Sequence, residues 1–185
     1  MNGVLFVSLV PLFAAFTLGA VDGVYFHLQR YRLFAHPESR GEHALHTVRA
    51  LLVLPPLTLL YLAEPAGLYL WIAAVCIAAD QVALALDVRA EATSRRRFGG
   101  LSAAEYQIHI AANGLHSVAL ALALASRPAL AWSLRESSLH CSSLPLVVQT
   151  VLGVLWLAAA VAAVQHVALL FAEQEDASPR TEQPA

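Results

Sequence analysis

The chain has 185 residues, of which 58% are hydrophobic and 13% are charged, and its mean hydropathy is +0.62. Soluble domains are about half apolar and about a quarter charged, so this composition excludes an ordinary soluble domain and predicts an integral membrane protein. The formal net charge of −2 argues against a nucleic-acid partner.

Five apolar runs are each long enough to cross about 30 Å of hydrocarbon. They cover residues 4–28, 42–62, 68–89, 103–125 and 145–171. No basic segment precedes the first run, so we expect a transmembrane helix there and not a cleaved signal peptide. We predict an all-α integral membrane domain over residues 1–172, with the first four helices as an antiparallel bundle. The acidic segment 173–185 is expected to be a disordered tail.

The arginines predict the orientation of these helices. Arginines flank or occupy the loops 29–41 and 91–102, whereas the short turn 63–67 has none, and the chain has no lysine. The positive-inside rule places both arginine-containing loops in the cytoplasm. We therefore expect the N-terminus outside and the C-terminus in the cytoplasm, in a bacterial inner membrane.

Two of the apolar runs begin with the same pattern, Glu-x-x-x-His. Glu42 and His46 open the second run, and Glu105 and His109 open the fourth. Ser102 stands three residues before Glu105, which predicts an N-cap. At about 100° per residue, each glutamate and its histidine lie on one helix face, so both side chains of a pair can reach one centre.

Ionisable residues of the other runs fall at a similar predicted depth. Asp22 lies near the cytoplasmic end of the first run, and Asp87 and Glu91 lie near that end of the third. Charged side chains are costly inside a membrane unless they pair, bind a ligand or face a polar cavity. We therefore predict a polar site in the cytoplasmic half of the bundle.

Carboxylates and imidazoles together suit iron, manganese or zinc, and the sequence offers no set of thiolates. Soluble di-iron bundles use related ligands at a different spacing, which is an analogy of ligand type only. We predict a site for two divalent metals, most simply iron or zinc. The first-choice ligands are Glu42, His46, Asp87, Glu105 and His109, and the next are Asp22, His43 and Glu91. The alternative for each residue alone is a salt bridge or hydrogen bond at a helix end.

Further polar residues surround the predicted site. Asp80 and His116 are expected to form a buried pair between the third and fourth runs, and Asn113 is a candidate hydrogen-bond donor to a ligand. Arg49 and Arg89 are candidates for contacts with an anionic headgroup.

Two further histidines receive structural interpretations. His27 is expected to extend toward the membrane interface and not to bind a metal. His166 is expected to make a hydrogen bond between packed helices.

The leading functional hypothesis is a metal-dependent membrane enzyme that acts on a lipid-like substrate at the cytoplasmic side. Iron would favour oxidation and need a redox partner, whereas zinc would favour hydrolysis. The chain lacks the paired-histidine boxes of membrane di-iron enzymes, which weakens the oxidation hypothesis. The alternatives are a b-type haem protein, a transporter or proton or ion conductor, and a non-catalytic membrane subunit.

Overall fold

The computed structural model describes residues 3–176, and this part of the chain is mostly helical. Within it, five helical segments are long and apolar enough to cross a membrane. They cover residues 3–35, 37–62, 68–94, 103–125 and 146–171. Each expected apolar run coincides with one segment, which is consistent with an integral membrane protein.

The first segment changes its helical geometry along its length. α1 (Gly3–Ala20) is a regular α-helix, and η1 (Val21–Arg30) continues it as a π-helix. In a π-helix each N–H bonds to the carbonyl five residues back, and such turns are frequent at functional sites. Two short 3-10 turns, η2 (Leu33–Ala35) and η3 (Pro37–Ser39), lead into the second segment.

Two prolines divide the second segment. α2 (Arg40–Leu52) ends just before α3 (Leu54–Leu57), and the π-helix η4 (Thr58–Leu62) completes the span. Pro55 and Pro56 lack N–H groups and cannot bond to carbonyls one turn back. The helix type therefore changes at this point, and the chain remains helical on both sides of it.

The remaining elements alternate long helices with short connections. β1 (Ala63–Ala66) pairs antiparallel with β2 (Ser138–Cys141), with Ala63 opposite Cys141. Between them lie α4 (Leu68–Ser94), the 3-10 turn η5 (Arg96–Phe98), α5 (Ala103–Ala125) and the 3-10 turn η6 (Ala129–Trp132). α6 (Leu146–Asp176) extends past residue 172 into the segment predicted as a tail, and residues 177–185 lie outside the described range.

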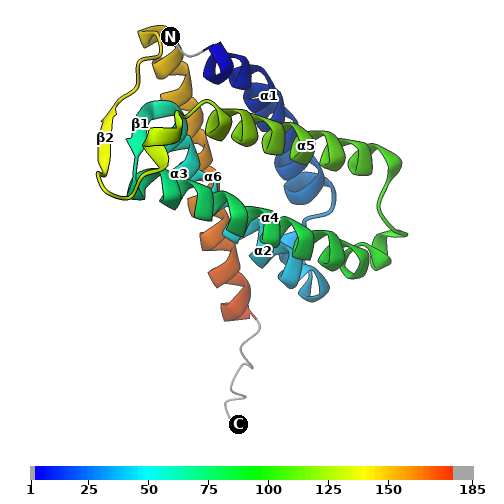
Figure 1. The fold of residues 1–185 in the computed structure, drawn as a ribbon. Coiled ribbons are helices and arrows are strands. Elements are labelled where there is room, and N and C mark those ends of the chain that lie inside the picture. Colours follow the sequence, from blue (N-terminus) through cyan, green and yellow to red (C-terminus); the bar gives the residue numbers. More distant parts are fainter. Residues whose placement is uncertain (1–2, 177–185) are drawn as a thin grey trace, which may run out of the picture.

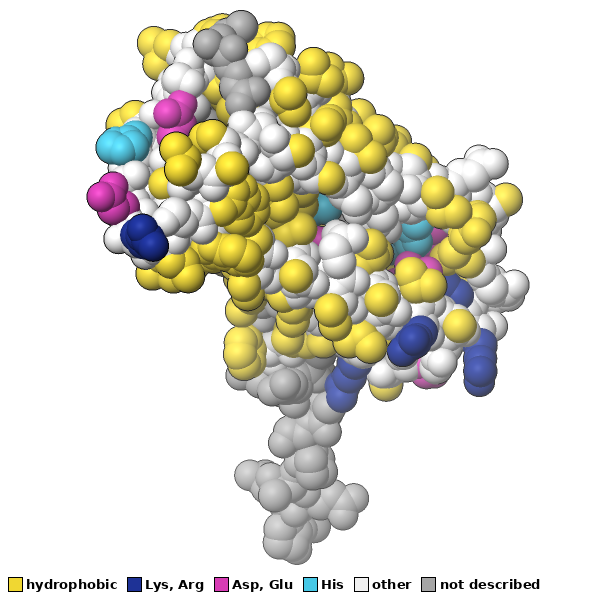
Figure 2. Space-filling model, viewed as in Figure 1, with side chains coloured by type: hydrophobic (Ala, Val, Ile, Leu, Met, Phe, Trp, Pro, Cys, Tyr) yellow, Lys and Arg dark blue, Asp and Glu magenta, His cyan; other side chains and the backbone are white. Residues whose placement is uncertain are grey.

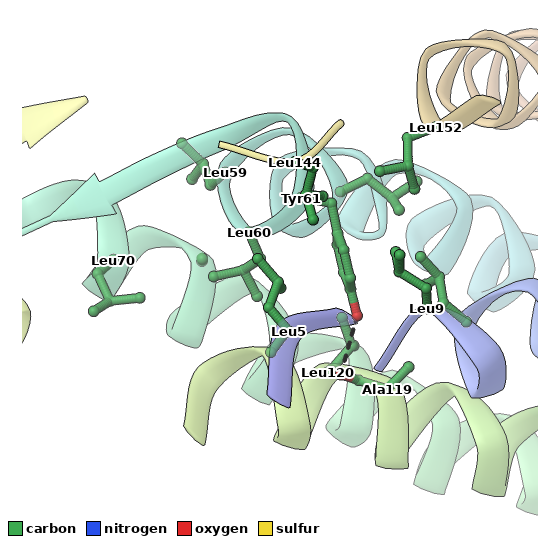
Figure 3. Close-up of a cluster of buried hydrophobic side chains, with 14 residues drawn as sticks. Leu5, Leu9, Leu59, Leu60, Tyr61, Leu70, Ala119, Leu120, Leu144 and Leu152 are labelled. Atoms are coloured by element: carbon green, nitrogen blue, oxygen red, sulfur yellow. Dashed lines mark hydrogen bonds between the residues drawn. The ribbon is translucent and has the colours of Figure 1, made fainter. Parts of the chain in front are cut away.

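The main apolar core lies beside β1, where Leu59, Leu60 and Leu70 are buried (Figure 3). Tyr61 is fully buried there, and its hydroxyl donates to the carbonyl of Ala119 at 3.0 Å. Leu5, Leu9 and Leu120 pack around it (Figure 3). The buried charged side chains of the described residues lie outside this apolar core.

The long helices pack in pairs. α1 lies along α5, and α2 lies along α4 and also packs against α6 (Figure 1). The strand pair lies at one end of α4 and α5, and the connection between these two helices lies at the other (Figure 1). Among the described residues, α1 and α6 come close to each other at few positions, so a seam remains between them.

The surface reflects this arrangement. Figure 2 shows hydrophobic side chains over most of the visible face, with arginines mainly near the end where α4 connects to α5. Histidine and acidic side chains are visible between α4 and α5 (Figure 2). The polar interior of the molecule is therefore visible from the surface between these two helices.

Candidate metal centre

The candidate centre begins with a pair of residues in the π-helix η1. Asp22 and His27 are five positions apart, and in an α-helix their side chains would point in different directions. The i→i+5 bonding of η1 brings them toward one face, and the His27 Nε2 lies 3.7 Å from the Asp22 Oδ2. Both side chains are buried.

Three side chains from the first two segments form the tightest candidate group. His27, Glu42 and His46 offer ligand atoms that all lie within 4.8 Å of one another. The Nε2 atoms of His27 and His46 each lie 3.9 Å from the same oxygen, Oε1 of Glu42. All three atoms are buried without a hydrogen-bond partner. Buried polar atoms without a hydrogen bond are rare and costly, so a ligand shared by these three atoms would stabilise them.

A second group shares His27 with the first. Asp22, His27 and His109 also offer three atoms within 4.8 Å of one another. Here the His109 Nε2 already pairs with the Asp22 Oδ1 at 2.8 Å, and its Nδ1 lies 2.9 Å from the Glu91 Oε1. An imidazole between two carboxylates uses both ring nitrogens as donors when it carries two protons. The two carboxylates therefore favour positive charge between them, carried by the doubly protonated ring or by a metal ion.

Two of the three separations in the first group are short enough for ligands of one metal ion. Zinc binds imidazole nitrogen at about 2.0–2.1 Å and carboxylate oxygen at about 2.0–2.2 Å, so two ligand atoms on one ion lie at most about 4.2 Å apart. The observed 3.9 Å separations fall within that limit. Because both groups use the Nε2 of His27, which can bind one ion, the two groups are alternative positions for an ion that includes His27 as a ligand.

A buried arginine closes the end of this region nearest the α4–α5 connection. Arg95 is 1% exposed, and its Nη1 donates to the Glu42 Oε2 at 2.8 Å. Its Nη2 and Nε lie 2.7 and 2.8 Å from the Glu105 Oε1. Burial alone would lower the pKa of Arg95, but the charges and hydrogen bonds of Glu42 and Glu105 raise it above its ordinary value. The arginine therefore stays charged and holds Glu42 with its other oxygen, Oε1, toward the two histidines.

A second arginine connects three helices deeper in the span. Arg49 of α2 donates to Asp80 at 3.1 Å and to Asp87 at 3.5 Å on α4, and to the Asn113 side-chain oxygen at 2.7 Å on α5. His116 lies 3.5 Å from the other oxygen of Asp80. The expected Asp80–His116 contact is present, and Asn113 accepts a bond from Arg49 where a donor role was expected.

The described charges of the two groups and their neighbours do not balance. Two guanidinium groups, Arg49 and Arg95, face six carboxyl groups in this region. The carboxyl groups belong to Asp22, Glu42, Asp80, Asp87, Glu91 and Glu105. With all of them ionised and the imidazoles neutral, a formal charge of −4 remains. Buried charge of this size requires protons or metal cations.

The structure places the predicted ligands in different positions. Glu42 and His46 belong to the first group, and Asp22 and His109 to the second. Asp87 flanks the first group, with its Oδ2 3.3 Å from the His46 Nε2 and its Oδ1 unpaired. Glu91 contacts His109.

Two other predicted ligands lie outside both groups. Glu105 is paired with Arg95, and its backbone N–H bonds to the Ser102 hydroxyl at 3.3 Å, as the N-cap pattern predicts. His43 turns toward α6, where its Nε2 lies 3.2 Å from the carbonyl oxygen of His166. The interhelical hydrogen bond expected at His166 is therefore made by its backbone.

The structure corrects two interpretations of the sequence. His27 does not extend to the interface, because it is only 4% exposed and belongs to both candidate groups. Arg49 does not point toward lipid headgroups, because its donors bond to Asp80, Asp87 and Asn113. Arg89, the other headgroup candidate, is exposed.

Sequence reasoning missed Arg95 altogether as part of the site. It stands in a run of three arginines that the positive-inside rule explains on its own. A sequence feature that could have indicated its contact with Glu105 is that Arg95 stands only ten residues before it, with Gly99 and Gly100 in the loop between them.

A cavity of about 350 Å³ adjoins the candidate groups and is lined by residues of all five long segments. His46, Asp87 and His109 line its polar part, whereas Phe16 and Leu155 belong to its apolar part. Pockets for small molecules have volumes of about 300–1,000 Å³ and are mostly apolar with a few polar groups. The cavity therefore has the size and lining of a binding site beside the candidate metal ligands.

Comparisons with known proteins add no relative: no family model, curated protein or solved structure matches the chain.

Proposed function

We propose that this chain is a membrane-embedded metalloprotein that holds one or two divalent ions, iron or zinc, and acts on a lipid-like substrate. The observation that carries the proposal is the convergence of three buried atoms that make no hydrogen bond, the Nε2 atoms of His27 and His46 and the Oε1 of Glu42. Buried groups of this kind are normally satisfied, and a shared cation satisfies all three at once.

Some residues of the site would bind the metal, and others would position those ligands. His27, Glu42 and His46 would hold one ion, and Asp22, His27 and His109 form the other group that would hold one, with Glu91 positioning His109. Bound iron would supply oxidation chemistry and bound zinc hydrolysis.

Two arginines keep the carboxylates of the site in place. Arg95 fixes the orientation of Glu42 through its 2.8 Å hydrogen bond, and Arg49 fixes Asp87 from the other side at 3.5 Å. The unpaired Oδ1 of Asp87 is buried, and Asp87 lines the cavity. In the proposed reaction this oxygen accepts a proton from the substrate or from water.

The positions of the arginines support the predicted membrane orientation. We propose that helices one to four form an antiparallel bundle across a bacterial inner membrane, with the metal site in the cytoplasmic half. The arginines beside the α4–α5 connection support this orientation, because cytoplasmic loops are rich in arginine. An iron enzyme would receive electrons from a redox partner at this cytoplasmic end.

The haem alternative has weaker support from the site. A porphyrin needs apolar surfaces beside its axial histidines, which in this chain would be His46 and His109. Carboxylates lie next to both of these rings. Glu42 lies 3.9 Å from His46, and Asp22 lies 2.8 Å from His109. A transporter would be metal-free when purified, and a non-catalytic subunit would tolerate alanine at the site.

Lipid turnover tests the enzymatic proposal. The protein is reconstituted in vesicles of extracted bacterial lipids with zinc, or with ferrous iron, a reductant and oxygen, and the lipids are analysed by mass spectrometry. Oxidised lipids, or the acid and alcohol or amine products of hydrolysis, are expected for the wild-type chain and not for Glu42→Gln. Equal lipid profiles with both proteins would contradict the proposal.

A further inference from the structure

The seam between α1 and α6 contains two hollows that follow one another along the helices. The cavity beside the candidate metal ligands takes Phe16 and Gly19 from α1 and Leu155 and Ala162 from α6. A second hollow of about 300 Å³ lies nearer the other end of the same seam. It is lined only by apolar residues, namely Phe6, Leu9, Val10, Phe13, Val147, Val148 and Val151.

The seam is open toward the surface that would contact lipid. Gly19 and Ala20 of α1 and Ala158 and Ala162 of α6 line the inner cavity and are also exposed. Their small side chains leave the entrance unobstructed. The entrance therefore faces the bilayer between two membrane-spanning segments.

The length and lining of the seam indicate what can occupy it. From Phe6 to Ala20 the α1 face extends about 21 Å at 1.5 Å per residue, a large part of the hydrocarbon thickness of a bilayer. The hollow nearer Phe6 is lined only by apolar side chains, and the cavity at the other end combines apolar side chains with polar groups. This lining fits an extended hydrocarbon chain with a polar end.

The end of the seam nearest the candidate metal ligands has polar groups that would contact the polar or reactive end of a bound molecule. The unpaired Oδ1 belongs to Asp87, whose side chain is 2% exposed and which lines the same cavity as His46 and His109. A buried polar atom without a partner is costly, so a ligand group that bonds to it is stabilised.

We propose that the α1–α6 seam binds one long acyl chain of a membrane lipid, with the polar end of that lipid beside His46, Asp87 and His109. The inference rests on the proposed function and names its substrate class. The chain enters sideways from the bilayer through the gap at Gly19 and Ala162, and its apolar end lies between α1 and α6 near Phe6 and Val147.

Spin-labelled stearic acid tests this inference with the full-length protein in detergent. Electron paramagnetic resonance measures the fraction of label that the protein immobilises. Gly19→Leu and Ala162→Leu fill the seam, and a Cβ at Gly19 meets no atom within 4 Å, so this variant is expected to fold. Gly114→Leu is the matched control, because Gly114 is exposed on α5 outside the cavity and also has space for a Cβ.

We expect wild-type and Gly114→Leu proteins to immobilise the label and both seam variants to bind it at least about tenfold more weakly. Equal binding by all four proteins, or none by the wild type, would overturn the inference. A dimer that dissociates in the seam variants would also overturn it, because a second copy would then cover the seam. Metal content of the same samples is a separate readout, so loss of the metal hypothesis is distinguishable from loss of the seam.

Discussion

His27 and His46 come from different helical segments, and their Nε2 atoms approach the same oxygen of Glu42 at 3.9 Å each. Their ring centroids lie 4.4 Å apart with the rings nearly perpendicular. Neither Nε2 has a hydrogen-bond partner. This relationship joins the π-helix of the first segment to the Glu-x-x-x-His pattern of the second, and the metal proposal depends on it.

Replacing Arg95 should destabilise the protein strongly. Arg95→Gln leaves Glu42 and Glu105 buried without their partner, which costs about 3–5 kcal/mol for a broken buried pair. Unfolding by sodium dodecyl sulfate in mixed micelles measures the change in free energy. Arg96→Gln is the matched control, because Arg96 is the exposed neighbour. Equal stability of the two variants would show that the Arg95 contacts contribute little.

Arg49 and Asp80 should be energetically coupled. Their 3.1 Å contact links α2 to α4 inside the span. Arg49→Met, Asp80→Asn and the double variant form a cycle whose coupling energy should be about 0.5–3 kcal/mol in the same unfolding assay. The control is a second cycle in which Arg89→Met replaces Arg49→Met, because Arg89 is an exposed arginine of α4. Additive effects of the Arg49 and Asp80 changes would contradict a stabilising contact between these two residues.

Metal binding should depend on pH with a defined sign. Imidazole and carboxylate ligands must lose protons to bind a metal, so bound metal should decrease as the pH falls from about 8 to about 5. Chelation at pH 8 should lower stability, by about 2.7 kcal/mol if free metal had been at about 100 times its dissociation constant. Glu42→Gln should lack both effects. Stability that is unchanged by chelator at every pH would argue against a metal.

The orientation of the chain can be checked with its own cysteines. Cys141 is exposed in β2, at the end of the molecule opposite the α4–α5 connection, whereas Cys76 is half-buried within α4. In intact cells, a membrane-impermeant maleimide should label Cys141. The label should disappear in Cys141→Ser and remain in Cys76→Ser. Labelling that requires broken cells would place the strand pair in the cytoplasm and reverse the proposed topology.

The sequence predicted the five spans because hydropathy and length depend on local composition. It also identified Glu42 and His46, which share the first candidate group, because Glu-x-x-x-His places both side chains on one face of an α-helix. In the fourth run the same pattern identified His109, whereas Glu105 pairs with Arg95 and lies outside both groups. The sequence failed at His27, because a periodicity of 100° per residue does not describe the π-helix η1. It failed at Arg49 because the partners of Arg49 are set by helix packing, which leaves no local pattern. It failed at Arg95 because the positive-inside rule already accounts for the run of arginines that contains it.

Elemental analysis of the detergent-purified protein gives the sharpest result. Wild-type protein should contain about one or two equivalents of iron or zinc per chain, and His27→Ala, His46→Ala and His109→Ala should bind it more than about 100-fold more weakly. His43→Ala is the control, because His43 is buried on the same helix as His46 but turns toward His166. It should keep its metal. Equal metal content in all five proteins would contradict the metal centre proposed for this fold.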